Sequence, residues 1–157
     1  MNSARRILPL VILVVPAFAV GCGGGGPQAV SATELVQKGD EICSQSRERF
    51  LQTSTVPLHN ASGGADQAEK LIEVLEDELS DLRNLEPPDP PRAAYDRYLA
   101  SLDRYRDYLQ RGKDAAEQQD GKAFAAAQAA AAAGAAKRQQ LARAVGFKEC
   151  SKAPGTD

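Results

Sequence analysis

Few residues of this 157-residue chain are of a type that does chemistry. Its one histidine, His59, stands in a segment rich in proline and glycine. General-base catalysis needs a partner that orients the imidazole, and no such partner is evident nearby. No C-x-x-C pair is present either, which argues against oxidoreductase chemistry. We therefore interpret His59 as a solvated loop residue and expect the protein not to be an enzyme.

The densest group of carboxylates lies between Glu69 and Asp81. Carboxylates at helical spacing can bind a hard cation such as Ca²⁺, but no glycine-turned loop of carbonyl ligands accompanies these. A di-iron bundle would need Glu-x-x-His motifs, which the chain lacks. We therefore expect a solvated helix face with no metal and no cofactor. The group comprises Glu69, Glu73, Glu76, Asp77, Glu78 and Asp81.

A basic stripe is the one candidate partner surface. Arg97, Arg104 and Arg111 recur at intervals of seven, and Tyr108 lies at their edge. Residues seven apart share a helix face, so the stripe could recognise an anionic polymer or the acidic patch of a partner such as an envelope protein. Interleaved aspartates favour the alternative of an ordinary solvated face. The formal net charge of −2 offers no basic excess for binding nucleic acid.

The N-terminal segment predicts export. Arg5 and Arg6 precede an apolar stretch, residues 7–20, that is too short to be a comfortable membrane span. The small residues Ala19-Val20-Gly21 then stand immediately before Cys22.

This arrangement resembles the lipobox of bacterial lipoproteins, in which small residues precede a cysteine that is lipidated and becomes the new N-terminus. One departure is Ala19, where the family usually has Leu. The resemblance implies a signal peptide over residues 1–21, a lipid on Cys22 and a glycine-rich tether over residues 22–31. An ordinary secretory signal with a chance cysteine, or an uncleaved anchor, are the alternatives.

Two further cysteines, Cys43 and Cys150, remain if Cys22 is acylated. An even pair in an exported protein predicts a disulfide. Such a bridge would restrict the unfolded chain, which the entropic account values at about 4–5 kcal/mol. Two buried or free thiols are the alternative.

Apolar periodicity and capping signals predict four helices. Ser31 and Glu34 have the spacing of a capping box, and Asp120 is a second N-cap candidate. Gly112 falls on the apolar side of the third helix, where it either permits close packing or breaks the helix. Gly146 suits the left-handed position after the last helix, with Phe147 folding back. The helices are expected at about Thr33–Gln52, Asp66–Leu85, Arg92–Gln119 and Lys122–Val145.

The connections between these helices are short, and no strand pattern competes with them. Short connections favour antiparallel neighbours, so we expect an all-α domain over residues 32–150 that forms an antiparallel up-down four-helix bundle. Residues 151–157 are expected to be a disordered tail.

The chain after Cys22 also resembles a loose set of short actinobacterial lipoproteins. In these, a cysteine on the first helix is matched by one shortly after the glycine that ends the last helix. Cys43 and the segment Gly146 to Cys150 correspond here, as does the proline-containing link from Leu85 to Pro91. The resemblance implies an envelope location and a helical fold, with no established activity.

These features predict a lipid-anchored domain on the extracytoplasmic face of a bacterial cell membrane. The membrane would be reached through the N-terminal lipid, and the domain would act as a non-catalytic interaction or accessory module. A solute- or ion-binding lipoprotein, using the acids of the second helix or the bundle interior, is the alternative.

Overall fold

The computed structural model describes residues 27–55 and 61–153. The predicted signal peptide (residues 1–21), Cys22 and His59 lie outside these ranges. The described residues are mainly helical, as predicted, and none of their helices is long and apolar enough to cross a membrane. The elements are β1 (Gln28–Ala29), α1 (Ala32–Ser54), α2 (Ala61–Arg83), β2 (Leu85–Glu86), α3 (Arg92–Glu117), α4 (Gly121–Ala133), α5 (Ala135–Val145) and the 3₁₀ helix η1 (Glu149–Ser151).

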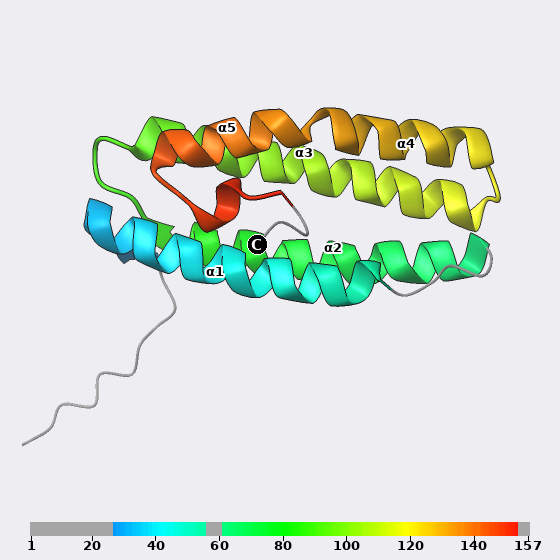
Figure 1. Ribbon diagram of the computed structural model, residues 1–157, viewed down its shortest axis with the longest axis horizontal. Coiled ribbons are helices and arrows are strands. Elements are labelled where there is room, and N and C mark those ends of the chain that lie inside the picture. Colours follow the sequence, from blue (N-terminus) through cyan, green and yellow to red (C-terminus); the bar gives the residue numbers. More distant parts are fainter. Residues whose placement is uncertain (1–26, 56–60, 154–157) are drawn as a thin grey trace, which may run out of the picture.

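The helices lie lengthwise beside one another in two layers, with α1 and α2 in one and α3, α4 and α5 in the other (Figure 1). α2 packs on both α1 and α3, and α3 packs on α4 and α5. In the part of the chain that the structure describes, α1 has no extensive contact with α4 or α5. η1 touches both α1 and α5 and so joins the two layers at one end.

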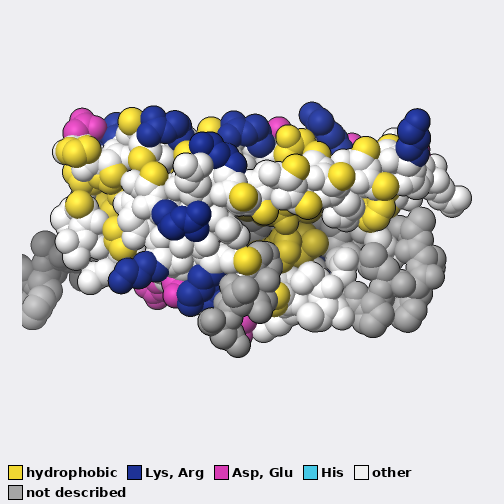
Figure 2. All heavy atoms as spheres, turned by 45° about the horizontal axis from the view of Figure 1, so that its top comes forward, with side chains coloured by type: hydrophobic (Ala, Val, Ile, Leu, Met, Phe, Trp, Pro, Cys, Tyr) yellow, Lys and Arg dark blue, Asp and Glu magenta, His cyan; other side chains and the backbone are white. Residues whose placement is uncertain are grey.

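An open seam therefore runs between α1 and the α4–α5 pair. In the space-filling view, a hollow with hydrophobic side chains at its base interrupts this face of the molecule (Figure 2). We call the gap between α1 and α4–α5, with the side chains that line it, the seam.

The predicted start of α1 is confirmed. The Ser31 hydroxyl accepts a hydrogen bond from the Glu34 backbone N–H, and the Glu34 carboxylate accepts one from the Ser31 N–H. These two bonds satisfy amides that the first helical turn leaves without a partner. α1 runs to Ser54, slightly beyond the predicted end at Gln52.

The junction after α2 differs from the prediction. α2 ends at Arg83, because Pro87 disfavours helical geometry at Glu86, the residue before it. The released segment pairs in parallel with β1, with Gln28 opposite Leu85. The expectation that no strand would form is therefore wrong for these two short segments. β1 lies within the segment predicted as a tether, residues 22–31. Because β1 pairs with β2, residues 28–29 of that segment belong to the folded unit.

Gly112 does not break α3, which continues to Glu117. Gly112 is buried, and a Cβ added there would lie 3.8 Å from the Cβ of Ala127 on α4. Of the two alternatives predicted for Gly112, close packing is therefore correct and a helix break is not. The Asp120 carboxylate caps α4 by accepting hydrogen bonds from the N–H groups of Lys122 and Ala123, as predicted.

The single last helix predicted from Lys122 to Val145 is wrong, because Gly134 divides it into α4 and α5. Gly134 keeps right-handed helical angles, so α5 continues in nearly the same direction as α4 (Figure 1). The Ala131 carbonyl accepts long hydrogen bonds from the guanidinium of Arg138, at 3.4 and 3.5 Å. The low helix propensity of glycine favours an interruption at this position. The Arg138 guanidinium supplies hydrogen bonds to a backbone carbonyl of the turn before it.

Phe147 lies at the centre of the core although it follows the last long helix. Gly146 has a φ of 104°, which glycine adopts without strain, and this turn directs Phe147 inward as predicted. The Phe147 ring meets Tyr95 and Tyr98 edge to face, with centroids 6.1 and 5.7 Å away. On its other side the ring rests against Gly39 of α1.

Gly39 is expected to be intolerant of any side chain. A Cβ at this position would lie 2.6 Å from Cζ of Phe147, so the Gly39→Ala variant should lose about 1–3 kcal/mol of free energy of unfolding. Gly121→Ala is the matched control, because nothing lies within 4 Å of an added Cβ there. That variant should gain about 0.4–1 kcal/mol. Urea unfolding monitored by circular dichroism measures both, and equal stabilities would contradict the close contact at Gly39.

Candidate functional site

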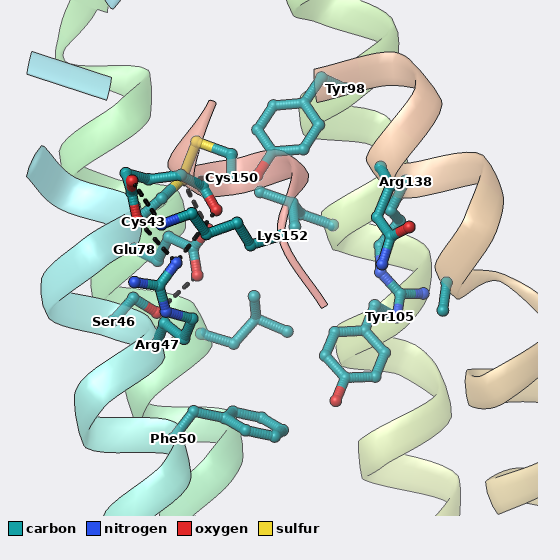
Figure 3. Close-up of a pocket in the computed structure, with 15 residues that line it drawn as sticks. Cys43, Ser46, Arg47, Phe50, Glu78, Tyr98, Tyr105, Arg138, Cys150 and Lys152 are labelled. Atoms are coloured by element: carbon teal, nitrogen blue, oxygen red, sulfur yellow. Dashed lines mark hydrogen bonds and ion pairs between the residues drawn. A yellow bond between two sulfur atoms is a disulfide. The ribbon is translucent and has the colours of Figure 1, made fainter. Parts of the chain in front are cut away.

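A cavity of about 130 Å³ opens at the end of the seam beside η1 (Figure 3). α1 and α2 form one wall and α3 and α5 the other, while the disulfide Cys43–Cys150 and the residues after it close one end. We call this space the polar cavity, because charged and hydroxyl side chains surround part of it. Its polar lining includes Ser46, Arg47, Glu78, Tyr98, Arg138, Glu149 and Lys152, and its larger apolar side chains are Phe50, Leu75, Leu102 and Tyr105.

Glu78 corrects the prediction of a uniformly solvated acidic face. The other five carboxylates of that group are exposed, whereas Glu78 turns inward from α2. Its Oε2 accepts a hydrogen bond of 2.6 Å from the Ser46 hydroxyl. Burial raises the pKa of Glu78 to about 6, and the hydrogen bonds from Ser46 and Tyr98 oppose that rise. Glu78 is thus a half-buried acid whose pKa lies above the usual value for a glutamate.

Arg138 faces the same cavity from α5. Its guanidinium carbon lies 4.0 Å from the centroid of the Tyr105 ring, a cation–π contact. Burial lowers the pKa of Arg138, but it remains a cation at physiological pH. Within the described residues Arg138 forms no ion pair, and its hydrogen bonds go to the Ala131 carbonyl alone.

Sequence reasoning missed both residues, although their spacing held a signal. Glu78 follows Leu75 by three positions and precedes Leu82 by four, so it falls on the apolar stripe of α2. Arg138 precedes Leu141 by three positions and Val145 by seven, so it falls on the apolar side of α5. A charged residue on an apolar stripe is a candidate for a buried polar site.

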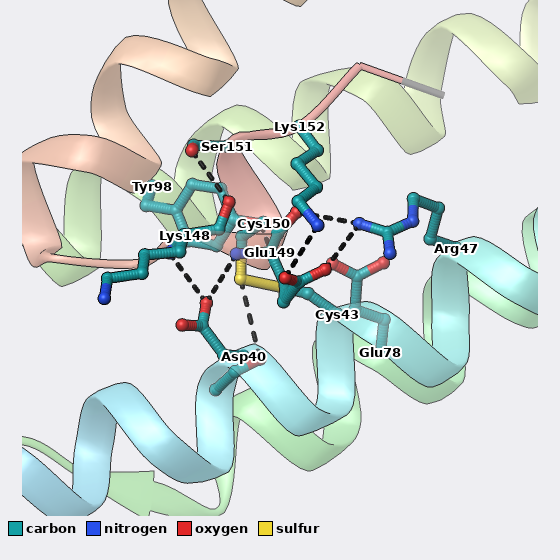
Figure 4. Close-up of polar contacts among 11 residues, drawn as sticks. Asp40, Cys43, Arg47, Glu78, Tyr98, Lys148, Glu149, Cys150, Ser151 and Lys152 are labelled. Carbon is teal, nitrogen blue, oxygen red and sulfur yellow. Dashed lines mark hydrogen bonds and ion pairs between the residues drawn. A yellow bond between two sulfur atoms is a disulfide. The ribbon is translucent and has the colours of Figure 1, made fainter. Parts of the chain in front are cut away.

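The residues after Gly146 hold α5 to α1 beside this cavity (Figure 4). The Asp40 Oδ1 accepts hydrogen bonds of 2.8 Å from the N–H groups of Lys148 and Glu149. Arg47 of α1 forms an ion pair of 2.8 Å with Glu149. We call residues 146–152 the clasp, because they span the seam at this end.

The predicted disulfide is confirmed. Cys43 and Cys150 are joined by an S–S bond of 2.06 Å, with 5.1 Å between their Cα atoms. Cys43 is buried, and its sulfur lies 3.6 Å from the Tyr98 hydroxyl. The bridge therefore fixes the clasp to α1 and forms part of the cavity wall.

A second, apolar cavity of about 230 Å³ continues along the seam away from the clasp. Phe50 and Tyr105 line both cavities, with ring centroids 6.2 Å apart, so the two spaces adjoin at this pair. We call this second space the apolar cavity. Its apolar lining includes Phe50, Ala68, Leu71, Tyr105, Tyr108, Leu109, Phe124, Ala127 and Ala131.

The predicted basic stripe lies elsewhere on α3. Arg97, Arg104 and Arg111 are exposed, and the guanidinium carbon of Arg111 lies 5.7 Å from the centroid of the Tyr108 ring. None of the three arginines takes part in an ion pair within residues 27–55 and 61–153. Asp103, an interleaved acid, pairs with Arg83 of α2 instead, at 2.7 Å. Recognition of a partner by this stripe remains a prediction.

The described part of the chain contains no group of three or more His, Cys, Asp or Glu side chains that could hold a metal ion. Comparison with protein-family models, with curated proteins and with solved structures finds no match to this chain.

Replacement of Glu78 should change the pH dependence of stability. The folded state holds the Glu78 proton more tightly than the unfolded state, whose pKa is 4.5. The contribution of Glu78 to the free energy of unfolding is therefore fully present below about pH 4.5, where the carboxyl is protonated. It is lost as the pH rises through about 6 and the folded state must hold the charged form. The stability of Glu78→Gln relative to the parent should increase by about 2 kcal/mol between pH 4 and 7.

Chemical denaturation across that pH range measures the difference. Glu73→Gln is the control, because Glu73 is an exposed carboxylate on the same helix. Parallel stability curves for the Glu78→Gln variant and the parent would show that Glu78 is solvated.

Proposed function

We propose that the chain is a lipid-anchored, extracytoplasmic helical domain that acts as a non-catalytic interaction or accessory module of a bacterial envelope. One observation carries this proposal: the disulfide uses Cys43 and Cys150 and leaves Cys22 as the remaining cysteine of the chain. A disulfide is typical of exported proteins, and Cys22 is the residue that the lipobox resemblance assigns to the lipid.

The same proposal includes the finer arrangement of the helices. We infer an antiparallel up-down bundle in which α4 and α5 together serve as the fourth member. The short link between α3 and α4 supports this arrangement, as does the proline-rich connection between α2 and α3. Such a bundle presents long helical faces to partners while the lipid holds one end of the chain near the membrane.

The basic stripe is the proposed contact surface for an envelope protein. Arg97, Arg104 and Arg111 are exposed and have no ion-pair partner within the described residues, so their donors are free for an acidic patch. Tyr108 adds a partly exposed ring beside Arg111. Arginine and tyrosine are enriched among residues that dominate protein interfaces.

The membrane anchor is tested by Cys22→Ser. This variant should leave the membrane fraction and lose labelling by a radioactive fatty acid, because the acylated thiol is gone. The double variant Cys43→Ser/Cys150→Ser is the control, since it removes two cysteines but keeps Cys22. Retention of Cys22→Ser in the membrane fraction would mean that the apolar segment 7–20 is the anchor.

The contact surface is tested by charge reversal. Arg104→Glu should reduce crosslinking to a dominant envelope partner by tenfold or more, as measured by in-cell crosslinking and mass spectrometry. Arg143→Glu, an exposed substitution on α5, serves as the control. An unchanged set of crosslinked proteins in the Arg104→Glu cells would remove the stripe as the interface.

Solute binding is the second candidate function, and the cavities of the seam favour it. Polar groups that converge on a concave space are typical of small-molecule sites. Glu78 and Arg138 converge in this way on the polar cavity.

A further inference from the structure

The seam is amphipathic along its length. Among the described residues that line the two cavities, the charged side chains all belong to the polar cavity, beside the clasp. Beyond Phe50 and Tyr105 the lining consists of aliphatic, aromatic and alanine side chains with a few neutral polar ones. A space with a charged end and an apolar extension matches a molecule that has a headgroup and a hydrocarbon chain.

The composition of α4 explains why side chains of the described residues do not fill the apolar cavity. Ala127 and Ala131 are the buried residues of this helix, and both line the cavity. Their methyl groups are too short to fill the space toward α1 and α2. Larger apolar residues at these positions would close the seam by ordinary core packing, so the alanines leave room for an apolar occupant.

Among residues 27–55 and 61–153, the charges at the polar end leave one cation, Arg138, without an ion-pair partner. The Glu149 carboxylate already forms ion pairs with Arg47, at 2.8 Å, and with Lys152, at 2.9 Å. Glu78 accepts from Ser46 on the opposite wall from Arg138. In the part of the chain that the structure describes, Arg138 donates to one carbonyl, through two long bonds, although a guanidinium carries five N–H donors. The Glu78 carboxylate favours the Arg138 charge from across the cavity but forms no ion pair with it, so the free N–H donors of Arg138 suit an anionic acceptor.

We propose that the seam binds a single-chain amphiphile with an anionic headgroup, of the class of long-chain carboxylates. The headgroup accepts hydrogen bonds from Arg138, with which a carboxylate can pair through two parallel bonds. The hydrocarbon chain runs past Phe50 and Tyr105 into the apolar cavity, where each buried methylene contributes about 0.8 kcal/mol. This inference rests on solute binding, the second candidate function, and is independent of a lipid on Cys22.

The probe is radiolabelled dodecanoate, below its micellar concentration, in equilibrium dialysis against the purified and delipidated Cys22→Ser chain. We expect saturable binding at one site per chain. Unlabelled dodecanoate should displace the label, whereas dodecyltrimethylammonium and butyrate at equal concentration should not. Dodecyltrimethylammonium lacks the anionic headgroup, and butyrate lacks the long hydrocarbon chain. Absence of saturable binding, or equal displacement by the cationic amphiphile, would overturn the proposal.

Three variants locate the site. Arg138→Gln should raise the Kd for dodecanoate at least tenfold, because a charge-assisted pair is lost. Arg143→Gln, an exposed arginine on the same helix, should leave the Kd unchanged. Ala131→Leu should also raise the Kd by filling the apolar cavity. Circular dichroism and the melting temperature verify that each variant is folded, and unchanged binding by folded Arg138→Gln and Ala131→Leu would contradict the assigned position.

Sedimentation of the same sample distinguishes other occupants of the seam. A dimer whose formation excludes dodecanoate would assign the seam to a second copy of this chain and overturn the proposal. A melting-temperature screen separates the two levels of the claim. If other solutes raise the melting temperature and dodecanoate does not, solute binding is supported and the amphiphile class is wrong. Both outcomes are independent of the test of the lipid anchor by membrane fractionation.

Discussion

The attachment of the clasp to α1 is the contact that closes the gap between α1 and α5, whereas the packing of α2 on α3 joins the two layers elsewhere. α1 packs on α2 but has no extensive contact with α4 or α5 among the described residues. The clasp spans this gap with a covalent bond between Cys43 and Cys150 and with the Phe147 ring set against Gly39. A disulfide between residues that are far apart in sequence also restricts the unfolded chain, which favours folding. The same bond marks the end of the seam.

Because the clasp holds the seam at one end, the rest of the seam need not be filled by side chains. The alanines of α4 pack closely on α3, where Gly112 permits contact, and they leave space on the side that faces α1. The polar interior follows from the same geometry. Glu78 and Arg138 reach the cavity from opposite layers without forming an ion pair there, which a closed bundle with a continuous apolar core would not permit.

Local structure followed closely from local chemistry. The Ser31–Glu34 capping box, the Asp120 cap and the left-handed Gly146 were predictable, because each depends on bonds between residues a few positions apart. The Cys43–Cys150 pair was predictable from cysteine number once export and a lipid on Cys22 were assumed, because two cysteines then remain. The division of the last helix at Gly134 was not, since alanine-rich flanks favour an unbroken helix by propensity.

The sequence by itself determined the helical class, most helix ends and the cysteine pairing. These properties depend on apolar periodicity, capping side chains and residue counts, all of which are local or compositional. Only the tertiary structure decided that Glu78 and Arg138 line one cavity and that β1 pairs with β2. Such relations join residues distant in sequence. They depend on how far apart the layers settle, which is set by the summed packing of side chains and the clasp and not by any single segment.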